Sequence, residues 1–151
     1  MKKYTTRFHV DVPPAMAFAY VKDPTSTMPR MSKMEVVHET PDGVGSTWRY
    51  EERFLGMRFT GLFVVTEYVE NKRIKGEFSG GLEEGEGTWT FKRAAGGTDV
   101  TIESGFRIRI PIVGPLAGRL MMRSGQPRWI PALQKEMEKY ARTAHTTKTA
   151  A

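Results

Sequence analysis

The chain has 151 residues, of which 39% are hydrophobic and 26% charged, values typical of a single folded domain with a substantial core. It contains no cysteine, which excludes disulfide bonds, thiolate nucleophiles and thiolate metal ligands. The net charge of +6 comes entirely from the last third: residues 1–106 hold 14 Lys and Arg against 15 Asp and Glu, whereas residues 107–151 hold 9 against 2.

The chain opens with the pattern of a strand followed by a short helix. Residues 4–12 alternate polar and apolar side chains well enough to predict a strand. Residues 13–23, PPAMAFAYVKD, begin with two prolines, which are well tolerated in the first turn of a helix, and Pro24 ends this helix. Residues 24–33 predict either a second short helix or an irregular turn, which Pro29 keeps short.

A run of strands follows. Strand patterns alternate with turn-forming stretches such as PDGVG and AAGG. The stretch GLEEG, residues 81–85, predicts a loop. Because each strand follows the previous one after a short turn, the pattern favours an antiparallel meander. The strands are predicted at residues 34–40, 46–54, 58–69 and 73–80, and in a hairpin within residues 87–106.

The last third changes to a helical pattern. Apolar residues take helical spacing over residues 113–145, and the prolines and glycine between 125 and 131 predict a kink or break there. Residues 146–151 are expected to form a flexible tail, which leaves a single domain over residues 1–145. A strongly twisted sheet needs a partner on its concave side, and the C-terminal helix is the only large apolar partner in the chain.

Four stretches resemble the polyketide cyclase/dehydrase-like branch of the START-like, or SRPBCC, superfamily. They are VPPAMAFAYVKDP after the first strand, HETPDGVGSTWRYEE, GTWTFKRAAGGTDVTIE, and the closing amphipathic helix. The resemblance implies an α+β helix-grip fold, in which about seven antiparallel strands curve around a long C-terminal helix and one or two short helices follow the first strand. It also implies a deep, mostly apolar cavity between sheet and helix.

The stretch STWRYEERF supplies the most distinctive candidate site. Trp48, Tyr50, Glu52 and Phe54 share one side of this strand. A carboxyl group in an apolar pocket holds its proton more readily and can act as a general acid or base. The alternative is that Glu52 pairs with an arginine at the sheet edge or faces water.

Two other residues are candidates for moving a proton or polarising a carbonyl group. These are Tyr68 and His38, both within predicted strands. The alternative for each is a structural role. Together with Glu52 they make up the candidate catalytic set.

The residues expected to contact a ligand are mostly large and apolar, and ordinary core packing is the alternative for each. Methionine adapts to varied apolar shapes. Arg119 and Arg123 lie one helical turn apart, so they either hold an anionic group of a ligand or point into water. The candidates are Trp48, Tyr50, Phe54, Trp89, Phe91, Phe106, Leu120, Met121, Arg123 and Met137.

Several function classes are not expected. His9, His38 and His145 are widely separated, so we expect no metal site. No phosphate-binding loop or nucleophile elbow is found, and no cofactor is expected. Aromatic residues are not interleaved with the basic ones, which argues against nucleic acid, whereas the basic C-terminal segment suits transient contact with an anionic membrane surface.

Three functional hypotheses remain, in this order. The first is binding of a small hydrophobic ligand, such as a lipid-like, polyketide or aromatic metabolite, in the cavity. The second is a cyclase/dehydratase-type enzyme that uses an acid/base pair in the same cavity. The third is a module with a filled core that works through its basic C-terminal surface. No signal peptide or membrane-spanning run is found, so a cytoplasmic monomer or homodimer is expected.

Overall fold

The computed structural model describes residues 2–23, 31–54, 56–81, 83–108 and 130–150. The described residues form seven strands and two helices. The elements are β1 (Lys2–Val10), α1 (Pro14–Lys22), β2 (Met31–His38), β3 (Thr47–Phe54), β4 (Met57–Val69), β5 (Arg73–Ser79), β6 (Glu83–Ala94), β7 (Gly97–Ile108) and α3 (Ile130–Ala150).

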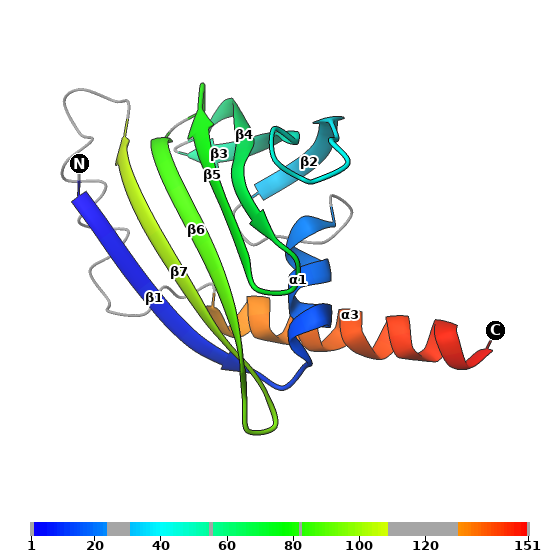
Figure 1. The fold of residues 1–151 in the computed structure, drawn as a ribbon. Coiled ribbons are helices and arrows are strands. Elements are labelled where there is room, and N and C mark those ends of the chain that lie inside the picture. The colour runs from blue at the N-terminus through cyan, green and yellow to red at the C-terminus, as the bar shows by residue number, and fades with distance from the viewer. Residues whose placement is uncertain (1, 24–30, 55, 82, 109–129, 151) are drawn as a thin grey trace.

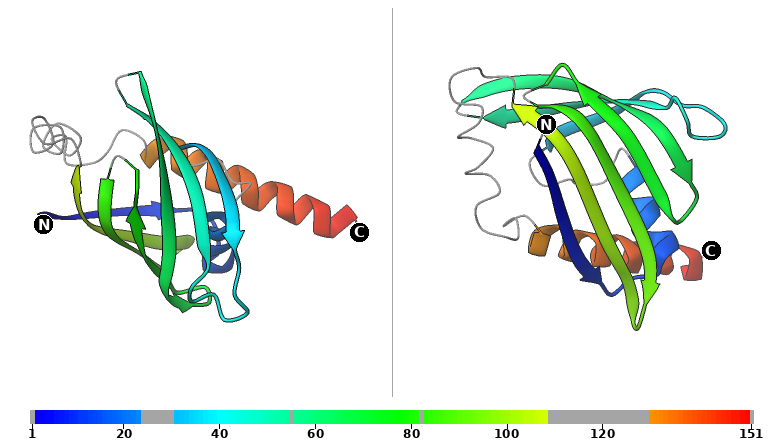
Figure 2. Two further views of the ribbon diagram at one scale, coloured as in Figure 1. Left: turned by 90° about the horizontal axis from the view of Figure 1, so that it is seen from above. Right: turned by 60° about the vertical axis from the view of Figure 1, so that its left-hand side comes forward.

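The described strands form one antiparallel sheet with the order β1-β7-β6-β5-β4-β3-β2. From β2 to β7 each strand pairs with the next along the chain, as short turns dictate. The first strand then pairs with the last, so that Lys2 lies opposite Phe106 and Val10 opposite Thr98. The sheet is strongly curved, and α1 and α3 lie on its concave side (Figures 1 and 2).

The two helices close one end of the concave side. Pro13 and Pro14 begin α1 at a position where a missing N–H costs little. Phe18 of α1 is fully buried and meets the ring of Phe91 edge-on, with 5.5 Å between ring centroids. The Tyr140 hydroxyl of α3 donates to Asp23 Oδ2 at 3.3 Å, which joins the end of α1 to α3. The core therefore lies where the two helices meet β1, β6 and β7.

The predicted α+β class, the antiparallel meander and the closing helix are confirmed. One prediction is wrong: β6 begins at Glu83, inside the expected loop 81–85, because Glu83 pairs with Ile108 in a longer hairpin. Helix α3 also continues to Ala150, past the expected end of the domain at residue 145.

Two other predictions fall mainly outside the described residues. The second short helix or turn was expected at residues 24–33, of which the structure describes only the start of β2 from Met31. The kink or break expected near residues 125–131 lies outside the described residues, apart from the start of α3 at Ile130. Neither helix in the described part of the chain has the length and hydropathy needed to cross a membrane.

Candidate functional site

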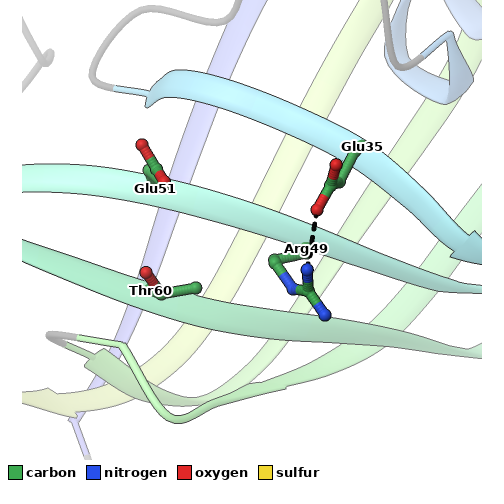
Figure 3. A pocket seen from close by; sticks show the side chains of 4 residues that line it. All are labelled: Glu35, Arg49, Glu51 and Thr60. Atoms are coloured by element: carbon green, nitrogen blue, oxygen red, sulfur yellow. Dashed lines mark hydrogen bonds and ion pairs between the residues drawn. The ribbon is translucent and has the colours of Figure 1, made fainter.

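The strand β3 presents Arg49 and Glu51 outward, and Trp48, Tyr50 and Glu52 inward. Figure 3 shows Arg49 and Glu51 with Glu35 of β2 and Thr60 of β4, around a shallow outer pocket of about 310 Å³. Arg49 Nη1 donates to Glu35 Oε1 at 2.8 Å. Because side chains alternate along a strand, the neighbouring positions 48, 50 and 52 face the concave side. Burial of Trp48, Tyr50 and Glu52 and exposure of Arg49 agree with the predicted alternation, whereas the side chain of Phe54 is not described.

A row of aromatic side chains crosses the concave face. The strand registers place Phe106, Gly85, Phe78, Phe63 and Trp48 next to one another on five consecutive strands. Trp48 stacks on Phe63, with 5.5 Å between centroids and 11° between planes. Phe106 extends the row to Tyr4 of β1, with 5.0 Å between the two ring centroids. Phe63 and Phe78 are only half-buried, so part of this aromatic surface stays accessible.

The neighbouring row on the same face is made of small residues. Ser104, Gly87 and Gly76 lie next to one another on β7, β6 and β5. A side chain at Gly76 would collide with the ring of Phe63, which leans over it. The small residues therefore leave space above the backbone beside the aromatic row, and the ring of Phe63 occupies part of this space.

Tyr50 and Glu52 form the polar part of this face. They are 4% and 7% exposed. A Cβ atom built on Gly81 would lie 3.3 Å from the Tyr50 hydroxyl and 3.4 Å from Glu52 Oε2, so both oxygens reach the same small region. A Cβ atom on Gly61, opposite Tyr50, would lie 2.5 Å from that hydroxyl. Two glycines therefore make the space that the tyrosine occupies.

The electrostatics of the pair keep the phenol protonated. Burial raises the pKa of Tyr50, and the negative charges of Glu52 and Glu83 raise it further. The hydroxyl is therefore a hydrogen-bond donor at all physiological pH values. Beside it, the Glu52 carboxylate supplies an acceptor. A donor and an acceptor on an otherwise aromatic surface can orient one polar group of an apolar molecule, or exchange a proton with it.

The other two candidate catalytic residues lie elsewhere. Tyr68 is half-buried at the helix end of the core, edge-on to Phe18 at 5.3 Å. Along β4 it lies seven residues from Gly61, the partner of Tyr50, which is roughly 20 Å in a strand. His38 is exposed at the end of the edge strand β2. The structure thus brings neither residue to Glu52.

The predicted ligand-contacting residues divide into three groups. Trp48, Tyr50 and Phe106 are buried on the concave face, in or beside the aromatic row, and Trp48 also packs in the core. Phe91 and Met137 are packed in the core. The ring of half-buried Trp89 stacks against that of Phe91, with 6.4 Å between the ring centroids. Core packing accounts for Phe91 and Met137 without a ligand. The structure does not describe Leu120, Met121 or Arg123, and it does not describe the side chain of Phe54.

Sequence reasoning missed Tyr4, Phe63 and Phe78, and the glycines around them. The alternation of Gly61, Phe63 and Val65 along β4 was a usable signal, because all three share one face. It did not show which aromatic residues on other strands would lie beside Phe63. The described residues bring together no group of three or more His, Cys, Asp or Glu suited to a metal ion.

Solved structures with the same fold come from several bacteria. A protein from Thermus thermophilus is 22% identical with a TM-score of 0.75, and the match covers 95% of this chain and 99% of that one. A START superfamily protein from Mycobacterium smegmatis is 16% identical with a TM-score of 0.71, over 94% and 98%. The Zhui aromatase/cyclase from a Streptomyces species is 12% identical with a TM-score of 0.72, over 95% of each chain.

Identities of 12–22% to these solved structures establish only a shared fold. The family assignment rests on the match of the sequence to a family model. No curated protein matches the chain. The family model described as polyketide cyclase/dehydrase and lipid transport matches residues 1–145, nearly the whole chain. The helix-grip arrangement of sheet and C-terminal helix agrees with that match. The chain therefore belongs to the polyketide cyclase/dehydrase and lipid transport family.

Proposed function

We propose that the protein binds a small hydrophobic ligand, of lipid-like, polyketide or aromatic character, between the concave face of the sheet and α3. The observation that supports this most strongly is the aromatic row, in which Phe63 and Phe78 are only half-buried, beside the buried side chains of Tyr50 and Glu52. The family, and the similarity to a START superfamily protein and to an aromatase/cyclase, agree with it.

The ligand is held mainly by burial of its apolar surface, at about 25 cal/mol per Å². The rings of Trp48, Phe63 and Phe106 provide flat apolar contact. The Tyr50 hydroxyl donates to a carbonyl or hydroxyl oxygen of the ligand, and the Glu52 carboxylate accepts from a ligand hydroxyl. The preferred ligand is thus an extended apolar molecule with one oxygen function near the end that meets these two side chains.

The first test is native mass spectrometry of gently purified protein, followed by organic extraction of any bound compound. We expect a discrete apolar compound that carries a hydroxyl or carbonyl group. A ligand-free mass, together with no uptake of a fatty acid or of anilinonaphthalene sulfonate, would contradict the proposal.

The second test measures affinity for the extracted compound in variants of β3. Tyr50→Phe removes one neutral hydrogen bond and is expected to weaken binding about fivefold, and Glu52→Gln about tenfold or more. Glu51→Gln is the matched control, because it makes the same chemical change on the outer face of the same strand. Equal losses in all three variants would show that position on the concave face does not matter.

A cyclase/dehydratase-type activity is the second candidate function. It is favoured by one observation: a Cβ atom built on Gly81 would lie 3.3 Å from the Tyr50 hydroxyl and 3.4 Å from Glu52 Oε2. In this hypothesis Glu52 takes a proton from the substrate while the Tyr50 hydroxyl hydrogen-bonds the oxygen on which charge develops. Incubation of the extracted compound or its precursors should then give a product with the natural protein, and Glu52→Gln should abolish turnover while retaining measurable binding.

A further inference from the structure

A second concave surface lies at the end of the sheet where two hairpins differ in length. Strand β5 begins at Arg73, opposite Thr90, but β6 continues to Ala94. The unmatched end of β6, the β4–β5 turn and the start of α1 surround a groove of about 630 Å³. Its lining residues are Pro14, Val69, Asn71, Lys72, Arg73, Thr90, Phe91, Lys92 and Arg93.

The groove has a mostly apolar surface with basic residues around it. Four of its described lining residues are Lys or Arg and none is acidic. Arg73 Nε lies 3.3 Å from Glu67 Oε1, but Lys72, Lys92 and Arg93 are exposed and form no ion pair with any carboxylate in the described part of the chain.

Acidic residues also lie at this end of the molecule, but none is among the described residues that line the groove. Glu70 belongs to the same turn but does not line the groove. Asp99, opposite Lys92, lies 2.9 Å from His9 Nδ1. The described lining of the groove therefore carries cations and no carboxylate, and the start of α1 adds the positive end of a helix dipole.

The same end of the molecule also projects and presents small or apolar groups. The β6–β7 hairpin extends beyond the rest of the sheet in Figure 1 and in the right-hand view of Figure 2. Its tip includes exposed Ala95 and Gly96, which allow a close approach to a surface. Val69, in the groove, is 43% exposed. Cations beside small and apolar groups are typical of surfaces that rest at a lipid–water interface.

We infer that this end of the molecule, formed by the β4–β5 turn and the β6–β7 hairpin, docks on an anionic membrane surface. Lys72 on one hairpin and Lys92 and Arg93 on the other are exposed to water, so they suit an array of lipid phosphates better than a single enclosed anion. Docking here does not depend on the proposed interior ligand. It assigns the membrane contact to these two hairpins, whereas the sequence pattern suggested the basic C-terminal segment.

The test is co-sedimentation of the full chain with vesicles of phosphatidylcholine, either pure or containing phosphatidylserine, at low and at physiological ionic strength. We expect binding only to the phosphatidylserine vesicles, and weaker binding as salt rises. The Lys72→Glu/Arg93→Glu variant should lower the partition coefficient about tenfold or more.

The matched control is Arg53→Glu/Arg58→Glu, which changes the net charge equally. Arg53 and Arg58 are exposed and face each other on the β3–β4 hairpin, at the other end of β4. This control should keep most of the binding. If charge reversal disturbs folding, as judged by the thermal unfolding midpoint, Lys72→Gln/Arg93→Gln tests the same cations more gently.

Three outcomes would overturn the inference. One is that the natural protein binds both kinds of vesicle alike. Another is that the two double variants lose binding equally, which would reflect net charge alone. The third is saturable binding of inorganic phosphate, detected by calorimetry, that Lys72→Glu/Arg93→Glu removes while vesicle binding is absent. That result would make the groove a site for a soluble anion.

Discussion

Tyr50 shows how single residues shape the concave face. Its phenol occupies space that exists because positions 61 and 81 have no side chain. Phe63 makes the same use of Gly76, and Tyr68 covers Gly43. In each case the aromatic residue and the glycine lie on different strands or turns, so the place of the ring depends on a glycine that is distant in the sequence.

Adding one methyl group at Gly61 tests this dependence. The new Cβ of Gly61→Ala would lie 2.5 Å from the Tyr50 hydroxyl, so the ring must move. We expect a loss of about 1–3 kcal/mol in the free energy of unfolding, measured by urea denaturation. Gly87→Ala is the matched control, because its Cβ meets only Phe78, at an ordinary contact distance of 3.7 Å. Equal losses in the two variants would exclude a specific role for the space under Tyr50.

At the scale of elements, the sequence predicted strand faces better than strand ends. Alternation alone placed Tyr50 and Glu52 on the buried side of β3 and Arg49 on the other side. It failed at the start of β6, because GLEEG has the composition of a loop. The strand forms there through contacts distant in sequence: Glu84 pairs with Arg107, both along the backbone register and through an ion pair. Tertiary context overrides local preference at this point.

The docking of α1 on the sheet depends on one side chain. Phe18 is fully buried and lies edge-on to both Tyr68 and Phe91. Phe18→Ala should lower the free energy of unfolding by about 3–5 kcal/mol in chemical denaturation, because it leaves a cavity between helix and sheet. The comparison is Ala15→Gln on the exposed side of the same helix, expected to stay within about 0.5 kcal/mol. A small effect for Phe18→Ala would show that α1 docks by other contacts.

At the scale of the whole molecule, the candidate site depends on the register of every hairpin. The aromatic row from Trp48 to Phe106, in which Gly85 takes the β6 position, is aligned by four successive strand pairings. A sequence pattern gives the face of each residue but not its neighbour on the next strand, and one shifted residue would separate the row. This is why Trp48 and Tyr50 could be predicted as candidates, whereas their arrangement with Phe63 and Phe78 could not.

Segments from both ends of the chain meet at His9. Its ring lies 2.9 Å from Asp99 of β7 and 3.2 Å from Asp11, and Gln134 of α3 donates to its carbonyl oxygen at 2.6 Å. The hydrogen bond with Asp99 is the main cause that raises the pKa of His9 above 6.5, and the charge of Asp11 adds to it. A raised pKa means that protonated His9 stabilises the folded state.

This stabilisation is complete below pH 6.5 and is lost as the pH rises through the folded-state pKa. The thermal midpoint of the natural protein should therefore exceed that of Asp99→Asn most clearly in acid, and the difference should shrink above neutral pH. NMR titration of the His9 ring checks the cause, since Asp99→Asn should return its midpoint toward 6.5. A difference independent of pH would contradict it.

The pairing of the first strand with the last has a consequence for synthesis. Each residue of β1 finds its partner about a hundred positions later, from Val10 with Thr98 to Lys2 with Phe106. At roughly 5–20 residues per second on the ribosome, β1 must wait about 5–20 s before β7 is available to pair with it. The meander from β2 to β6 can form in that interval, since each of its strands pairs with the next one made. The first strand to be synthesised is thus among the last to be incorporated, and until then its apolar side is exposed to whatever chaperones the nascent chain.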